Sequence, residues 1–179
     1  MPKTVNLPTD EELEEIENFF DGTLGDRFQC FGCSNRNDQS LKLRFFRKKH
    51  EDKEKKVVFC KIPPLGNQRT SFPGVVHGGV ISTIIDDTAY WTLFENKRIL
   101  ALTMEMSVQY QAPFSSNAEG VAIGEIEDDS LPKISVRVTV ADKRSGMILA
   151  LGTVKFFVPP KEKISQIMGP TGNELLNKL

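Results

Sequence analysis

Residues 73–94 read PGVVHGGVISTIIDDTAYWTLF, and this stretch decides the fold. Pro73 and Gly74 interrupt the preceding segment, and after His77 the apolar residues recur with the period of an α-helix. At about 100° per residue, one broad apolar face contains Val80, Ile81, Ile84, Ile85, Thr88, Ala89 and Trp91. The pattern predicts a long helix that begins near His77 and packs through this face.

The segments on either side of this helix have the pattern of β-strands. Apolar and polar residues alternate clearly just after the helix, where Met104, Met106 and Tyr110 are expected on one face and Thr103 on the other. The expected strands cover residues 41–47, 56–62, 102–110, 119–127, 134–140 and 147–158. Short connectors favour antiparallel pairing, and a lone long helix can bury its face only against a sheet. We therefore expect an α+β fold with about six antiparallel strands around one long helix.

Short extensions are expected at both ends of this core. Thr9–Phe20 is predicted as a short acidic N-terminal helix, because Thr9 or Asp10 can cap it and its apolar residues form one stripe. A charged turn is expected at residues 48–56, between the first two strands. The expected division is an N-terminal helical extension at residues 1–28, a main domain at residues 29–160 and a C-terminal tail at residues 161–179.

The composition argues against several classes of function. The chain has 23 Lys and Arg residues against 24 Asp and Glu residues, so its charge gives no reason to expect a nucleic-acid partner. No apolar run approaches the roughly 20 residues of a membrane-spanning helix, and the N-terminus lacks a secretory pattern, so we expect no membrane partner. Cys30, Cys33 and Cys60 are an odd number of cysteines and are predicted to be free thiols. These features together predict a cytoplasmic protein.

Within the long helix, Asp86 is the residue with the clearest chemical potential. It projects nearly opposite the apolar face, near Tyr90 and Leu93, whereas Asp87 lies at the flank of that face, so the two carboxylates are not expected to form a pair. The apolar residues near Asp86 indicate a covered surface, and we expect a partner subunit to cover it. Burial in such a contact raises the pKa of a carboxyl group, which suits a general base.

The start of the helix is a second candidate for chemistry. A helix N-terminus has backbone N–H groups without partners, and Gly78 and Gly79 let a ligand approach them closely. Such donors can stabilise the negative charge that develops on a carbonyl oxygen. The same residues also fit a purely structural interpretation, in which His77 caps the helix, the glycines permit close packing and Asp86 is a surface residue. The residues alone favour neither interpretation.

Several motifs together resemble a known family. PGVVHGG at residues 73–79, with Asp86 nine residues after His77, is similar to the signature of PaaI-like acyl-CoA thioesterases of the hotdog fold. CFGC at residues 30–33 and LKLRF at residues 41–45 resemble motifs that open many members. The resemblance covers about residues 30–159, which is most of the chain.

The resemblance implies a hotdog fold, in which a curved antiparallel sheet wraps around one long helix, and hydrolysis of an acyl-CoA thioester without a cofactor or metal. It implies that Asp86 acts as nucleophile or general base, that the Gly78 N–H polarises the thioester carbonyl, and that Thr103 orients the attacking water. It also implies homodimers, or dimers of dimers, with active sites at the dimer interface.

The expected substrate-binding residues are His77, Gly79, Thr70 and Ser71. Thr70 and Ser71 depart from the family, because many members have Asn or Gln in this stretch. The departure leaves open a second function, that of a non-catalytic acyl-CoA or acyl-carrier binding protein. A hotdog hydratase or dehydratase is a third, which the spacing of His77 and Asp86 fits less well.

Three other interpretations are weaker. A zinc site is disfavoured because a structural site normally has a second closely spaced pair of ligands; its members would be Cys30, Cys33, His50 and Cys60. Basic residues at 42–49 and 143–144 are candidates for the phosphates of coenzyme A, although exposed basic side chains are usually solvated surface. No GxSxG motif occurs, which disfavours a Ser-His-Asp hydrolase.

Overall fold

A seven-stranded antiparallel sheet dominates the computed structural model, which describes residues 3–50 and 56–179. Its strand order is β1-β2-β3-β7-β8-β9-β6. The strands are β1 (Leu13–Glu15), β2 (Arg44–Lys48), β3 (Val58–Ile62), β6 (Leu102–Tyr110), β7 (Gly120–Asp128), β8 (Lys133–Asp142) and β9 (Ile148–Phe157). Two further strands, β4 (Thr70–Phe72) and β5 (Val75–Val76), form a separate antiparallel pair.

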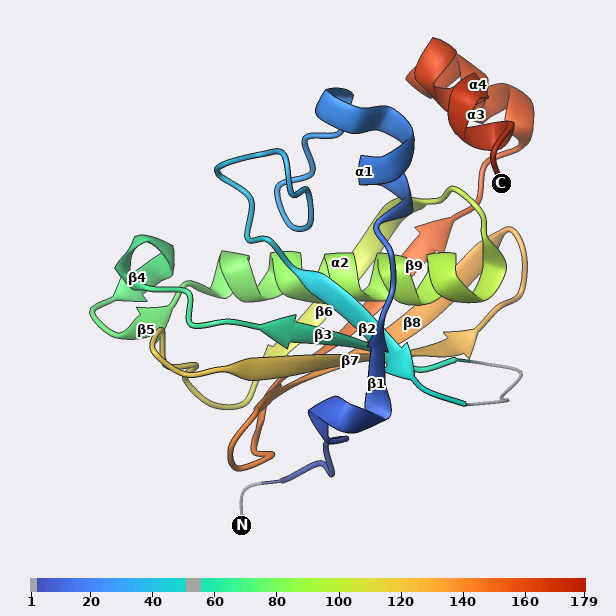
Figure 1. The fold of residues 1–179 in the computed structure, drawn as a ribbon. Coiled ribbons are helices and arrows are strands. Elements are labelled where there is room, and N and C mark those ends of the chain that lie inside the picture. The colour runs from blue at the N-terminus through green and yellow to red at the C-terminus, as the bar shows by residue number, and fades with distance from the viewer. Residues whose placement is uncertain (1–2, 51–55) are drawn as a thin grey trace.

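One long helix lies along the sheet, and shorter helices lie on the side of that helix away from the sheet. The helices are α1 (Phe19–Leu24), α2 (Gly78–Lys97), α3 (Lys161–Met168) and α4 (Pro170–Leu176), with short 3-10 turns η1 (Asp10–Glu12), η2 (Gly25–Arg27) and η3 (Asn67–Arg69). Figure 1 shows α2 on one face of the sheet, α1 on the side of α2 away from the sheet, and α3 and α4 near α1. The predicted α+β architecture of a long helix on an antiparallel sheet is confirmed. Among the described residues, none of the helices combines the length and the apolar composition that a membrane span requires.

The predicted apolar face of α2 is the face that packs on the sheet. Ile84, Ile85 and Ala89 are fully buried. Gly124 in β7 and Gly152 in β9 allow the close approach, since a Cβ at these positions would lie 2.0 Å from Thr92 Oγ1 and 2.5 Å from Ile85 Cγ2. The helix axis is therefore held close to the sheet by two positions that have no side chain.

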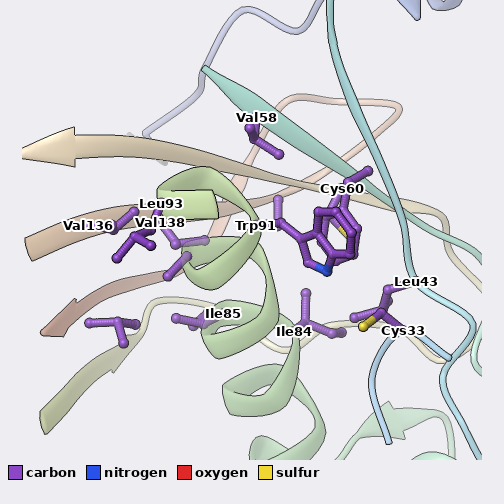
Figure 2. Close-up of a cluster of buried hydrophobic side chains, with 14 of the residues drawn as sticks. Cys33, Leu43, Val58, Cys60, Ile84, Ile85, Trp91, Leu93, Val136 and Val138 are labelled. Carbon is purple, nitrogen blue, oxygen red and sulfur yellow. The ribbon is translucent and has the colours of Figure 1, made fainter. Parts of the chain in front are cut away.

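Trp91 is a core residue, as its place on the apolar face predicts. It is 1% exposed, and its ring stacks on Phe45 of β2 at a centroid distance of 5.1 Å. In Figure 2, Trp91 points toward Cys60 of β3, while Leu93 points toward Val136 and Val138 of β8. The sheet curves around α2, so side chains on both flanks of the helix are buried.

The prediction of one helix over Thr9–Phe20 is wrong. This segment instead forms the turn η1, the edge strand β1 and, after Asn18, the first turn of α1. Leu13 is buried in a small apolar cluster on the outer face of the sheet, whereas Ile16 belongs to the main core. A single helical stripe could not bury both, because they lie on opposite faces of the sheet.

Ion pairs hold the edge strand β1 against β2. Glu14 accepts a hydrogen bond from Arg47 Nε at 2.6 Å, and Glu15 forms an ion pair with Arg44. These pairs add to the backbone pairing of β1 with β2, which holds this acidic segment extended. The charged turn predicted at residues 48–56 falls largely on residues 51–55, outside the described residues.

The C-terminal half of α2 is covered by the same chain on its far side. The ring of Phe20 in α1 contacts Tyr90 and Phe94 at centroid distances of 5.9 Å and 4.9 Å. Ile164 in α3 and Leu175 in α4 are also part of the main core cluster. The expectation that a partner subunit covers Tyr90 and Leu93 is therefore wrong, because α1 covers Tyr90 and Leu93 points into the sheet.

Candidate functional site

At the start of α2 a side chain caps the helix, and the two glycine N–H groups there differ in whether they are hydrogen-bonded. His77 is the N-cap residue, and its Nδ1 accepts a hydrogen bond from the Gly79 N–H at 2.9 Å. The Gly78 N–H has no hydrogen-bond partner among the described residues. Of the two glycines, Gly78 therefore has the N–H that a ligand can use, while the side chain of His77 is exposed and the Gly79 N–H is occupied.

Tyr110, at the end of β6, connects this strand to the helix start. Its hydroxyl donates to the Gly78 carbonyl oxygen at 2.9 Å and lies 2.9 Å from Ser82 Oγ. A Cβ at Gly78 would lie 3.3 Å from the same hydroxyl oxygen, so the glycine permits the contact. Strand alternation places Tyr110 on a face but carries no signal for this hydrogen bond.

Thr70 and Ser71 lie in β4, beside the start of α2. The His77 N–H donates to the Arg69 carbonyl oxygen at 2.8 Å, which brings this segment next to the helix cap. Thr70 Oγ1 already donates to the Asn67 carbonyl oxygen at 2.8 Å, and Ser71 is exposed. The structure thus places both residues near Gly78, with the Thr70 hydroxyl proton engaged within its own loop.

Asp86 is a half-buried carboxylate two turns further along α2. Thr103 Oγ1 donates to Asp86 Oδ1 at 2.8 Å. Burial raises the pKa of Asp86 above its ordinary value, and the hydrogen bond from Thr103 partly opposes this shift. The carboxyl group is therefore more basic than an exposed aspartate and is held by a hydroxyl from β6.

An irregularity in β6 brings Thr103 to this position. Thr103 pairs with Phe156 and Glu105 pairs with Lys155, so Met104 is an extra residue on β6. Phe156 is fully buried beneath α2, and Thr103 therefore faces the helix, together with Met106 and Tyr110 beyond the bulge. The prediction that Thr103 lies on the opposite face from Met106 and Tyr110 is wrong, because strict alternation cannot anticipate an inserted residue.

Asp87 lies in a different cluster, with Cys30 and Cys33. Its Oδ2 is 3.6 Å from Cys30 Sγ, and the two sulfur atoms are 3.0 Å apart. Burial is the main cause that raises the pKa of Asp87, to about 8. The two neighbouring carboxylates thus have separate partners, as their positions on the helix predict.

This cluster differs from the zinc site considered from the sequence. Cys30, Cys33 and Asp87 are the ligand-type side chains that gather in the described part of the chain, with their ligand atoms within 4.8 Å of one another. His50 and Cys60 are not members of the group. No sequence pattern indicates Asp87 here, because its contact with residues 30–33 depends on the loop folding back onto α2.

A cavity of about 240 Å³ lies between α2 and the helices on its far side. Its walls are mainly apolar and include Phe20, Tyr90, Leu100, Ile164, Met168 and Leu175. Asp87, Cys30 and Cys33 also line it. The cavity is thus built by the N-terminal and C-terminal segments around the second carboxylate of the helix.

The basic residues considered for phosphate binding are largely paired. Arg47 bonds to Glu14 and to the buried Glu95, and Lys49 Nζ donates to the Glu11 carbonyl oxygen at 2.8 Å. Lys143 lies between Asp10 and Glu119, at 3.5 Å and 3.3 Å. These contacts favour a structural role for the basic residues near β2.

The arrangement of sheet and helix matches that of solved thioesterases. The protein has the hotdog fold of PaaI-like thioesterase structures. A hypothetical thioesterase with coenzyme A from Streptococcus pneumoniae is 17% identical, with a TM-score of 0.55 over 64% of this chain and 85% of that one. Zebra fish thioesterase superfamily member 2 is 14% identical, with a TM-score of 0.59 over 77% of this chain and 96% of that one.

The Escherichia coli PaaI protein from the phenylacetic acid degradation operon is a further structural relative. It is 11% identical, with a TM-score of 0.52 over 56% of this chain and 75% of that one. Neither a protein-family model nor a curated protein sequence matches the chain. The likeness at these identities is one of fold.

Proposed function

We propose that the protein hydrolyses an acyl-CoA thioester. The observation that carries the proposal is the half-buried Asp86 carboxylate, with a raised pKa and a hydrogen bond from Thr103, in a hotdog helix whose Gly78 N–H has no partner among the described residues. The presence of coenzyme A in a structure of the same fold supports a coenzyme A ester as the substrate class.

In the proposed reaction, Asp86 takes a proton from a water molecule that Thr103 helps to position. The water oxygen attacks the carbonyl carbon, and the Gly78 N–H donates to the oxyanion that forms. The carbon–sulfur bond then breaks, and the proton passes to the leaving thiolate. The products are a free acid and coenzyme A, and no cofactor takes part.

One subunit alone does not place both groups at one thioester. Asp86 lies eight residues after Gly78, which corresponds to about 12 Å along the helix axis at 1.5 Å per residue. Reacting groups must lie within roughly 3–3.5 Å of the reacting atoms. We therefore infer that a complete site joins Gly78 of one subunit to Asp86 of a second subunit.

The exposed edge of the sheet supports such a homodimer. β6 is an edge strand of nine residues that pairs only with β9 in the described structure. Its apolar side chains are exposed, with Met104 at 50% and Tyr110 at 52%. A long exposed apolar edge is a template for pairing with a second chain, and it carries Thr103 next to Asp86.

Release of free thiol from a panel of acyl-CoA esters tests the proposal. We expect Asp86→Asn to lower kcat/KM by roughly 10²–10⁴, the range of a positioned base. The matched control is Asp38→Asn, which changes an exposed loop aspartate and should leave the rate unchanged. Wild-type turnover by Asp86→Asn would refute the role of this carboxylate.

The same panel separates the binding function from hydrolysis. A non-catalytic binder would be stabilised thermally by an acyl-CoA ester and would release no thiol. One observation keeps the non-catalytic binding function open. The Thr70 hydroxyl already donates its proton within the loop beside Gly78, so it does not offer that proton to a substrate.

Two substitutions at one position test the backbone donor. Gly78→Pro removes the N–H, and proline is tolerated at the first helical position, where the preceding His77 already has an extended conformation. Gly78→Ala keeps the N–H while adding a Cβ near Tyr110. We expect the proline variant to lose roughly 10²–10³ more activity than the alanine variant. Equal activities would exclude the Gly78 N–H as the donor.

Mixed oligomers test the shared site. Gly78→Pro and Asp86→Asn subunits, inactive alone, should regain part of the activity when they are unfolded and refolded together, since one of the two sites in a hybrid dimer is then intact. If a verified hybrid dimer recovers no activity, Gly78 and Asp86 either act within one subunit or serve separate functions.

A further inference from the structure

The loop that carries Cys30 and Cys33 packs against α2 away from the start of the helix. Both cysteines are free, and their sulfur atoms are 3.0 Å apart. The Cys33 N–H also donates to Cys30 Sγ, at 3.3 Å. A disulfide bond is about 2.05 Å long, so a shift of about 1 Å joins the two sulfurs without a large change in the loop.

Gly32 and Asp87 complete the cluster. A Cβ at Gly32 would lie 1.9 Å from Asp87 Oδ2, so only glycine lets the carboxyl group lie against this turn. Asp87 Oδ2 is then 3.6 Å from Cys30 Sγ. The two thiols of the loop and the carboxyl group of Asp87 on α2 therefore lie in mutual contact.

The two cysteines have different electrostatic surroundings. The hydrogen bond from Cys33 is the main cause that lowers the pKa of Cys30, with further support from backbone N–H groups. The pKa of Cys33 is raised by that same hydrogen bond and by burial. Cys30 is thus the thiolate of the pair and Cys33 the buried thiol. The pKa of Asp87 is about 8, so its carboxyl group keeps its proton at neutral pH and becomes a proton acceptor as the pH passes about 8.

Access to the pair comes from the cavity between α2 and the terminal helices. Cys30 is only partly buried, and it lines the cavity of about 240 Å³ together with Cys33 and Asp87. Cys60 is fully buried and does not line this cavity. A small reagent therefore has a route to Cys30 that it lacks to Cys60.

We propose that Cys30 and Cys33 form a reversible redox pair, in which Cys30 attacks a small disulfide and Cys33 resolves the adduct, with Asp87 as the proton acceptor. The proposal does not depend on thioester hydrolysis. A metal site is the alternative that the geometry disfavours. A structural zinc site has four protein ligands, whereas Cys30, Cys33 and Asp87 are the three ligand-type side chains that gather here in the described part of the chain.

The two steps balance with glutathione disulfide as the oxidant. The Cys30 thiolate attacks one sulfur of glutathione disulfide, which forms a mixed disulfide and releases one glutathione thiolate. Cys33 then gives its proton to Asp87 and attacks Cys30 Sγ, and the second glutathione leaves as a thiolate. The cysteines lose two electrons and the one proton of Cys33, which Asp87 takes up, and glutathione disulfide gains the two electrons to become two glutathione thiolates.

Intact-protein mass spectrometry with glutathione disulfide tests the proposal. We expect the wild-type chain to lose the mass of two hydrogen atoms and to regain it with dithiothreitol. Cys33→Ser should accumulate a stable glutathione adduct, and Cys30→Ser should acquire none at Cys33. Cys60→Ser is the matched control and should behave as the wild type. Above about pH 8, where the Asp87 carboxyl group has lost its proton, Asp87→Asn should slow closure of the mixed disulfide by roughly a hundredfold, at the low end for a positioned base.

Two outcomes would overturn the proposal. The first is a wild-type chain that keeps a stable glutathione adduct or remains unmodified in an excess of oxidant, because Cys33 then does not resolve Cys30. The second is a purified protein with one zinc ion per chain whose two thiols react only after a chelator removes the metal. Because both outcomes are measured on the wild-type protein, the test holds even where a variant folds poorly.

Discussion

The buried carboxyl group of Asp87 should make the protein less stable as the pH rises. The pKa of this group is about 8 in the folded protein, against 3.8 for the free side chain. Above about pH 4, Asp87 has lost its proton in the unfolded chain but keeps it in the folded chain. The contribution of Asp87 to stability is therefore greatest below the pKa it has in the unfolded chain, and it falls until the pH passes about 8. At ~1.4 kcal/mol per pH unit, the loss between pH 5 and pH 8 is roughly 3–4 kcal/mol.

Asp87→Asn isolates this effect, because asparagine has nearly the same shape and no charge to lose. Urea denaturation of the reduced protein should show the variant gaining stability relative to the wild type by roughly 3 kcal/mol as the pH rises from 5 to 8. The lowered pKa of Cys30 makes the stability rise with pH, which opposes the effect of Asp87. The comparison is therefore repeated in a Cys30→Ser background, where the burial that raises the pKa of Asp87 remains. If the free energy of unfolding changes with pH in the same way with and without the Asp87→Asn substitution, in both backgrounds, the reasoning is refuted.

Three further changes give measurable outcomes. Gly124→Ala should destabilise the protein by roughly 1–3 kcal/mol, since its Cβ meets Thr92 Oγ1 at 2.0 Å; an unchanged denaturation midpoint would contradict the close packing of helix on sheet. Glu95→Ala should cost roughly 1.5–3 kcal/mol, because it removes hydrogen bonds to Arg47 and Lys56, whose charged groups are partly exposed and can be solvated; chemical denaturation measures the loss, and an unchanged stability would contradict a stabilising role for this buried carboxylate. Thr103→Val should raise the pKa of Asp86 by removing a hydrogen bond that lowers it, so the acidic limb of kcat/KM against pH should move to higher pH, and an unmoved limb would argue against Asp86 as the titrating base.

The sequence predicts the parts of the fold that have a strong period. α2 starts next to His77 and six predicted strands are present, because burial on one face imposes a helical or an alternating pattern on the residues. The strand β1 is not predicted, since its three residues depend on pairing with β2 rather than on any local preference.

The candidate site shows the same division between local and long-range information. The positions of Gly78 and Asp86 on the helix follow from their spacing in the sequence. The contact of Thr103 with Asp86 depends on the bulge at Met104, and the contact of Asp87 with Cys30 depends on a distant loop. Both contacts require tertiary structure that no local pattern contains.

The strand order of the sheet delays assembly of the candidate site during synthesis. β6 follows α2 directly in the chain, yet its partner in the sheet is β9, where Leu102 pairs with Phe157. Domains form as the chain leaves the ribosome from its N-terminus, and a strand without its partner stays open to other pairings. Asp86 and Thr103 therefore become stably fixed only after nearly the whole sheet has been made, so a ribosome-bound chain truncated before β9 should lack an ordered site.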